Sequence, residues 1–190
     1  MPLVIVPMSL LGARLWRHYL ATRRLTDRYI PNRVQQWSKR HGTQPYREQI
    51  HGVCLFSDVE GYTAISESIS TAELWEFTRR HFDLFSRIVT ERQGEILNID
   101  GDAVVAVWPC DRDDEVAHRL AIEAAMACHA QVDSLHAQHQ GQLRARVGLH
   151  AGCLVWSDLP AGQRFEYAGM GDALNTAARM EQRNKPLGTY

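Results

Sequence analysis

The tightest constraint on the fold is a predicted hairpin in the middle of the chain. Two apolar runs, EILNID (95–100) and AVVAVWP (103–109), are separated only by Gly101 and Asp102. So short a connection joins antiparallel strands, because parallel strands need a crossover of about a dozen residues or more. The chain is therefore expected to contain an antiparallel sheet that includes this hairpin.

Long helices are predicted on both sides of the hairpin. Residues 71–92 carry apolar side chains at helical spacing, behind a capping-box signature at Ser70 and Glu73, and 113–139 form a second long helix. The other expected elements are a strand over 53–58, a strand pair over 143–152 and 153–158 turned at Ala151-Gly152, a loop over 158–162, a strand over 164–169 and a helix over 171–183. This order predicts an α+β fold with a ferredoxin-like βαββαβ core, an antiparallel-rich sheet with its helices packed on one face.

Bulk properties narrow the class of protein. A chain of 190 residues is one ordinary domain with a short extension, and its net charge of -1 gives no electrostatic reason to expect nucleic acid as a partner. The four cysteines form no C-x-x-C pair, which indicates a reducing compartment and no structural zinc. Gly42 and Pro45 mark a linker. We therefore predict an N-terminal helical and linker segment over 1–47 and a compact domain over 48–190.

The first twelve residues, MPLVIVPMSLLG, are apolar, and four arginines follow them within the next twelve positions. This run is too short to cross a bilayer, which needs about 20 apolar residues. Two interpretations remain: the start of a surface helix, or the last part of a membrane helix whose beginning is missing. We favour the second, which would attach the compact domain to the inner face of the plasma membrane, on the cytoplasmic side.

Two carboxylates are predicted to meet at one edge of the sheet. Asp58 ends the strand VCLFSD, and Asp102 lies in the turn of the hairpin. If these strands are neighbours, both side chains suit Mg²⁺, a hard ion that takes one or two protein carboxylates together with water and phosphate oxygens. The segment Val59–Thr63 would then turn backbone N–H groups toward those phosphates, with Gly61 permitting close approach. Either aspartate alone is more simply explained as a turn residue.

A third feature is the stretch GMGDALNTAARME (169–181). Asn175 and Arg179 are four residues apart, so they share one helical face and can act together. An arginine beside a reacting phosphate absorbs the charge that develops in the transition state. The simpler alternative is an exposed arginine on a helix.

Four ordered blocks resemble the signature blocks of class III nucleotidyl cyclases, the adenylate and guanylate cyclase catalytic domain. They are LFSDVEGYTAISE, GEILNIDGDAVVAVW, RVGLHAG and FEYAGMGDALNTAARME, and the resemblance extends over residues 51–190. It implies a phosphorus–oxygen lyase of signal transduction, in which the ribose 3′-oxygen of ATP attacks the α-phosphate to give 3′,5′-cyclic AMP and pyrophosphate.

The resemblance also implies site residues and partners. Asp58, Asp102 and the backbone carbonyl of Val59 would hold two Mg²⁺ or Mn²⁺ ions, and Asn175 and Arg179 would act in the transition state. The nucleotide-binding positions would be Gly61, Tyr62, Thr63, Asn98 and Ala168. The chain is expected to pair head to tail, as a homodimer or with another cyclase domain. Each site then takes its metal ligands from one chain and its Asn/Arg pair from the other, so a monomer is expected to be inactive.

The sequence departs from the family pattern at three places. Asn98 stands where adenylate cyclases usually carry a base-selecting lysine, and Ala168 stands where they carry Asp or Thr, so ATP and GTP both remain candidate substrates. The chain also ends at GTY, where the family adds further strands and a phosphate-contacting lysine, and we interpret it as incomplete at the C-terminus. These departures leave an alternative open: a catalytically impaired module that binds nucleotide or a partner cyclase.

Overall fold

The computed structural model describes residues 12–22, 32–42, 44–135, 144–161 and 164–189, in two compact units, Met1–Tyr46 and Arg47–Tyr190. The first unit contains a helix over 12–22 and helix α2 (Asn32–His41), in which Trp37 stacks on His41 with ring centroids 3.9 Å apart. Among the helices described, none has the length and apolar character needed to cross a membrane.

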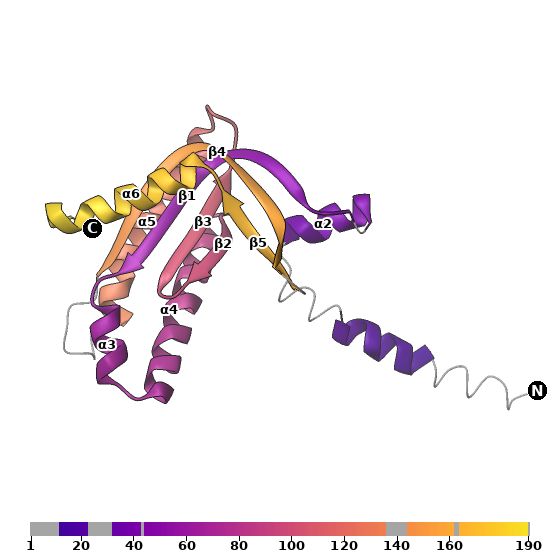
Figure 1. The fold of residues 1–190 in the computed structure, drawn as a ribbon, viewed down its shortest axis with the longest axis horizontal. Coiled ribbons are helices and arrows are strands. Elements are labelled where there is room, and N and C mark those ends of the chain that lie inside the picture. Colours follow the sequence, from indigo (N-terminus) through magenta and orange to yellow (C-terminus); the bar gives the residue numbers. More distant parts are fainter. Residues whose placement is uncertain (1–11, 23–31, 43, 136–143, 162–163, 190) are drawn as a thin grey trace, which may run out of the picture. The chain divides into compact units, whose positions relative to one another are not determined.

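The second unit is built on one five-stranded sheet in which every pairing is antiparallel, in the order β2-β3-β1-β4-β5 (Figure 1). Its strands are β1 (Arg47–Val59), β2 (Glu95–Asp100), β3 (Ala103–Pro109), β4 (Ala145–Ala161) and β5 (Arg164–Met170). Its helices are α3 (Tyr62–Ser68), α4 (Thr71–Glu91), α5 (Glu115–Leu135) and α6 (Asp172–Leu187). The segment from β1 through α4, β2, β3 and α5 to β4 is the predicted βαββαβ core.

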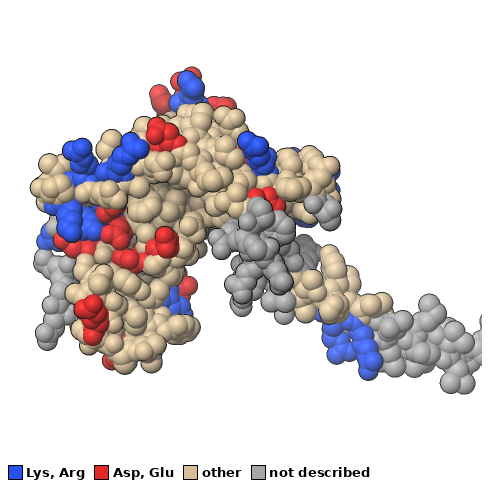
Figure 2. Space-filling model, viewed as in Figure 1, with Lys and Arg blue, Asp and Glu red and all other residues tan. Residues whose placement is uncertain are grey.

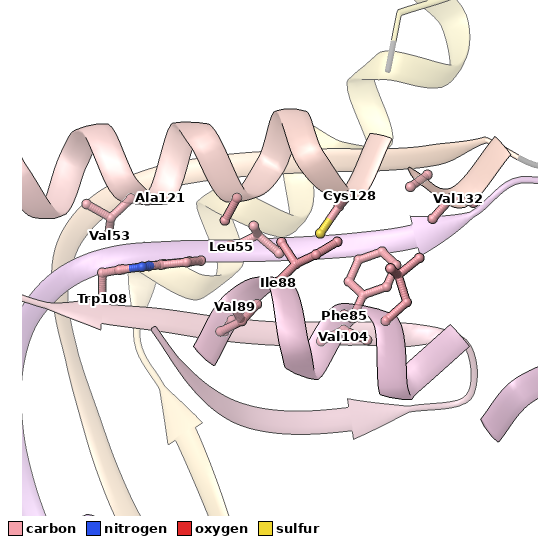
Figure 3. Close-up of a cluster of buried hydrophobic side chains, with 14 of the residues drawn as sticks. Val53, Leu55, Phe85, Ile88, Val89, Val104, Trp108, Ala121, Cys128 and Val132 are labelled. Carbon is pink, nitrogen blue, oxygen red and sulfur yellow. The ribbon is translucent and has the colours of Figure 1, made fainter. Parts of the chain in front are cut away.

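Helices α4 and α5 cover one face of the sheet and bury the main core there. Figure 3 shows Phe85 and Ile88 of α4 lying with Leu55 of β1 and Cys128 of α5, all at most 1% exposed. The capping box predicted at Ser70 is formed, because its side chain accepts from the Glu73 backbone and Glu73 reaches back to the Ser70 N–H. The α+β, ferredoxin-like prediction is confirmed.

Helix α6 packs on the other face of the sheet, against β4. Side chains alternate along a strand, and on β4 Ala145 belongs to the main core while Gly148 and Gly152 face α6. A Cβ on Gly148 would lie 2.0 Å from the Ala177 carbonyl oxygen, so only glycine allows α6 to approach this closely. The sheet is thus held between two helices on one side and one on the other. The prediction that the helices pack on one face holds for α4 and α5 of the core, and α6 departs from it because Gly148 and Gly152 leave room for a helix on the opposite face.

The predicted turn at Ala151-Gly152 is wrong. β4 runs unbroken from Ala145 to Ala161, and residues 145–157 pair continuously with β1. Gly152 was mistaken for a turn residue, but it lies in mid-strand where α6 comes close, since a Cβ there would be 3.1 Å from the Ala173 Cβ. The predicted loop over 158–162 is likewise strand up to Ala161, and residue 162 lies outside the described part of the chain.

Other boundaries moved outward. β1 begins at Arg47, six residues before the predicted start, because its first half pairs with the far half of β4. α6 continues to Leu187 rather than ending at 183, and α3 was not predicted. The end of the predicted helix over 113–139 falls on residues 136–139, outside the described residues.

Candidate active site

The structure brings Asp58 and Asp102 together. Asp58 is the penultimate residue of β1, and Asp102 lies in the turn that leads into the neighbouring strand β3. The backbone N–H of Val59 donates to Asp102 Oδ2 at 3.2 Å. Burial, a side-chain hydrogen bond with Asp58 and the negative charge of Asp58 raise the pKa of Asp102 to about 6. When two carboxylates are this close, the negative charge of one disfavours ionisation of the other. A bound cation would offset the repulsion between the two charges.

Arg146 contacts one member of this pair, Asp58. It is paired with Asp58 across strands β1 and β4, so both side chains point to the α6 face of the sheet. Its Nη2 donates to Asp58 Oδ2, and its Nε donates to Glu181 Oε1 of α6 at 2.7 Å. The Nη1 atom of Arg146 also lies 3.9 Å from Glu60 Oε1. Arg146 therefore ties the candidate metal-binding edge to helix α6 through a buried guanidinium.

Neither Arg146 nor Glu181 was singled out from the sequence. The available signal was a lone arginine within the apolar strand RVGLHAG and a glutamate at the end of the last block. Matching them requires the register between β1 and β4, and the mistaken turn at Ala151-Gly152 hid that register.

His81 was also missed, and it lies behind the carboxylate pair. It belongs to α4, is 1% exposed, and packs against the rings of Phe82 and Phe85, with centroids 5.5 and 4.5 Å away. Burial lowers the pKa of His81 to about 4, against the opposing effects of the Asp102 backbone and the Asp58 charge. The imidazole is thus neutral near pH 7 and lies close to both aspartates.

The loop that follows Asp58 leads directly into α3. Gly61 has φ 85°, a left-handed conformation that glycine adopts without strain, and it immediately precedes α3. Backbone N–H groups in the first turn of a helix have no acceptor within that helix, so those of Tyr62 and Thr63 are free for a ligand. The Tyr62 hydroxyl is bonded to Thr78 Oγ1 at 3.0 Å, which directs its ring to α4. Thr63 is exposed.

Asn98 and Ala168 lie on the two edge strands, β2 and β5, yet the sheet curls so that these edges meet. Leu97 is an extra residue in a β-bulge opposite β3. A Cβ on Gly169 would lie 2.9 Å from Leu97 Cδ1. The residues next to Asn98 and Ala168 are therefore in contact, although Asn98 itself is exposed and bonds the backbone N–H of Ile99 at 2.9 Å.

Asn175 and Arg179 are not directed at the aspartates of their own chain. Both are exposed on α6, whereas Ala177 and Glu181 on the same helix are buried. Residues two positions apart are separated by about 200° around a helix, so the exposed pair faces away from the sheet. In Figure 2, basic side chains gather over α6, with acidic side chains nearby in the direction of the end of β1.

The donor set fits a hard divalent cation better than a transition metal. Among the described residues no group of three or more His, Cys, Asp and Glu side chains could hold a metal ion. Two carboxylates in contact are instead a partial oxygen shell of the kind that Mg²⁺ completes with water and phosphate oxygens.

The chain belongs to the adenylate and guanylate cyclase catalytic domain family, which it matches over residues 46–187. Adenylate cyclase 1 of Rhizobium meliloti (strain 1021) is 31% identical over 152 residues, covering 78% of this chain and 23% of that protein. An adenylate cyclase of Anabaena cylindrica is 26% identical over 142 residues, covering 70% of this chain and 27% of that protein. This chain therefore spans about a quarter of the length of these relatives.

Solved structures share the fold. A bacterial light-regulated adenylyl cyclase superposes with a TM-score of 0.78 at 21% sequence identity, covering 95% of this chain and 54% of that chain. The adenylyl cyclase CyaB from P. aeruginosa gives a TM-score of 0.66 at 22% identity, covering 73% of this chain and 74% of that chain.

Proposed function

We propose that this chain is a cyclase catalytic domain that converts ATP into 3′,5′-cyclic AMP and pyrophosphate. The observation that carries the proposal is the contact between Asp58 and Asp102, with the Gly61 loop directly after them. Family membership and the 31% identical adenylate cyclase of Rhizobium meliloti support the same reaction and favour ATP as substrate.

Asp58, Asp102 and the carbonyl of Val59 would hold two Mg²⁺ or Mn²⁺ ions. Such ions, when bound, supply activation of the attacking 3′-oxygen and neutralisation of the leaving pyrophosphate. The chain's own residues prepare that arrangement. The Val59 N–H orients Asp102, and Arg146 holds Asp58 on the α6 face of the sheet. The N–H groups of Tyr62 and Thr63 can donate to the triphosphate.

We propose further that a complete site requires two chains. Asn175 and Arg179 face away from the sheet of their own chain, which supports a role at the carboxylates of another. A head-to-tail pair, either two copies of this chain or this chain with another cyclase domain, gives two equivalent sites. In each site, Arg179 would stabilise the negative charge that develops at the α-phosphate, and Asn175 would act beside it. Because that charge develops in the transition state, these contacts would be stronger there than with bound ATP.

The alternative is a module that binds nucleotide or a partner cyclase without turnover. Asn98 and Ala168 favour it, because neither carries the charged or hydroxyl group with which related adenylate cyclases select adenine. An amide at Asn98 can hydrogen-bond either purine, which leaves the preference between ATP and GTP open to experiment.

The test is direct measurement of product. The purified chain, at concentrations where it is dimeric, is incubated with ATP or GTP and Mn²⁺ or Mg²⁺, and cyclic nucleotide and pyrophosphate are quantified by chromatography. Asp58→Ala and Asp102→Ala should each abolish turnover, while Asp113→Ala, an exposed aspartate outside the site, should not. Nucleotide binding without product, in the dimer and in a mixture with an active cyclase domain, would support the alternative and refute the enzyme.

A further inference from the structure

The helix over residues 12–22 carries an exposed apolar face that the proposed catalysis does not use. Its large apolar side chains, Leu15, Trp16, Tyr19 and Leu20, are 61%, 61%, 52% and 36% exposed. At 100° per residue these four positions fall within one arc of about 140°. The rings of Trp16 and Tyr19 stack with centroids 5.6 Å apart, so they form one continuous surface.

The opposite face of the same helix is basic. Arg14 and Arg17 lie on it, and the first acidic residue in the sequence is Asp27. Figure 2 shows basic side chains gathered on one side of this helix. Arg17 Nε bonds the carbonyl of Ala13 at 3.4 Å, which leaves the rest of its guanidinium for other partners.

We propose that residues 12–22 bind along the surface of an anionic lipid bilayer, with the Trp16 face in the interface and the arginines against lipid phosphates. Trp and Tyr are enriched at the level of lipid headgroups, and a helix with one apolar and one basic face binds parallel to a membrane. The described helical residues, 12–22, extend over about 17 Å. Their basic face would be costly inside a hydrocarbon core but not at its surface, so this part of the chain fits a position along the interface.

A second copy of this helix is a poorer partner for the apolar face. Pairing two copies through their apolar faces would leave the arginines on the outer faces, with no acidic residue in the helix to offset their charge. An anionic bilayer satisfies both faces at once, because it offers an apolar interior beside negative charge.

The experiment is flotation of the intact chain with lipid vesicles. One set of vesicles is phosphatidylcholine alone, and the other is phosphatidylcholine with phosphatidylserine. We expect binding to the anionic vesicles that weakens as salt is raised. The double variant Trp16→Ser and Leu20→Ser should lower the partition coefficient by about tenfold or more. Each substitution removes apolar surface that the bilayer would otherwise bury, and the two losses add. Trp16→Phe should retain most of the binding.

Two control variants are matched to these changes. Trp75→Ser removes another exposed tryptophan, 66% exposed on α4, and should leave binding unchanged. Arg14→Glu with Arg17→Glu should weaken binding to anionic vesicles by about tenfold or more. Arg79→Glu with Arg80→Glu changes the net charge equally on α4, where both arginines pair with Glu76, and should have little effect.

Three results would overturn the proposal. The first is absence of binding by the unaltered chain, and the second is equal binding by the Trp16 and Trp75 variants. The third is a change of oligomeric state in the Trp16 variant, measured by light scattering, with vesicle binding unaffected, since that would assign the face to a second copy. None of these measurements uses catalytic activity, so they stand apart from the test of the proposed reaction.

Discussion

Arg146 is buried between two carboxylates that come from different elements, Asp58 on β1 and Glu181 on α6. Because Glu181 is only 3% exposed, Arg146→Ala would leave a buried charge without its partner. We expect a loss of about 3–5 kcal/mol in the free energy of unfolding, measured by urea denaturation. Arg119→Ala is the matched control, since the Arg119–Glu123 pair is exposed and should be worth less than about 1 kcal/mol. Equal losses in the two variants would contradict this account of Arg146.

His81 makes stability depend on pH in a defined direction. Its pKa is lowered from 6.5 to about 4 by burial. Between these values the unfolded chain binds a proton that the native state does not, so the free energy of unfolding should fall as the pH is lowered through this window. The limit for one such group is about 3 kcal/mol.

The measurement is chemical denaturation of the unaltered chain and His81→Leu at several pH values, without divalent ions. The stability difference between the two proteins should shift in favour of the variant as the pH falls from 7 toward 5. A difference that is constant with pH would show that His81 does not titrate in this way.

The sequence alone predicts some of the contacts between individual site residues and not others. Asp58 and Asp102 could be placed together because one ends a strand and the other occupies a two-residue turn, so local patterns fix both positions. Arg146, Glu181 and His81 could not, because their partners are set by strand register and helix packing over long sequence separations. The roles given to the site residues by family resemblance stay predictions.

The contact between α6 and β4 depends on the absence of a side chain at Gly148. A Cβ there would meet the Ala177 carbonyl oxygen at 2.0 Å and the Glu181 backbone nitrogen at 2.4 Å, and backbone atoms cannot turn aside. Gly148→Ala should therefore destabilise the domain by about 3 kcal/mol and lower turnover, because displacing α6 also disturbs Glu181 and Arg146. Thermal unfolding and the cyclase assay measure the two effects. Gly12→Ala, with nothing within 4 Å, is the control and should not destabilise.

The same contact explains why the types of most elements were predicted well, whereas the turn at Ala151-Gly152 was predicted wrongly. Strand and helix types follow from periodicity within each segment, and these were mostly right. A glycine in a strand-like sequence can mark either a turn or a place where another part of the backbone comes close to the strand. The local sequence around Gly152 does not distinguish these two cases. Only the position of Ala173 on α6 shows that close approach is the reason.

For the whole molecule, the decisive feature is that the two halves of the candidate site point in different directions. Asp58, held by Arg146 and in contact with Asp102, lies on the strand side of α6. Asn175 and Arg179 lie on its exposed side. If each site is shared between chains, a variant that lacks the carboxylates and one that lacks the arginine should both be inactive alone, yet each retains what the other has lost.

Mixing tests this arrangement. Asp58→Ala and Arg179→Ala chains, each without turnover alone, are mixed in equal amounts and allowed to exchange subunits. Half of the dimers should then be mixed, and each mixed dimer holds one intact site of two, so about a quarter of the original activity should return. Mixing Asp58→Ala with Asp102→Ala is the control and should restore none, because every site then lacks a carboxylate. If the first mixture stays inactive while exchange is demonstrated by mass spectrometry, the shared site is wrong, whereas turnover by monomeric chain would show that one chain suffices.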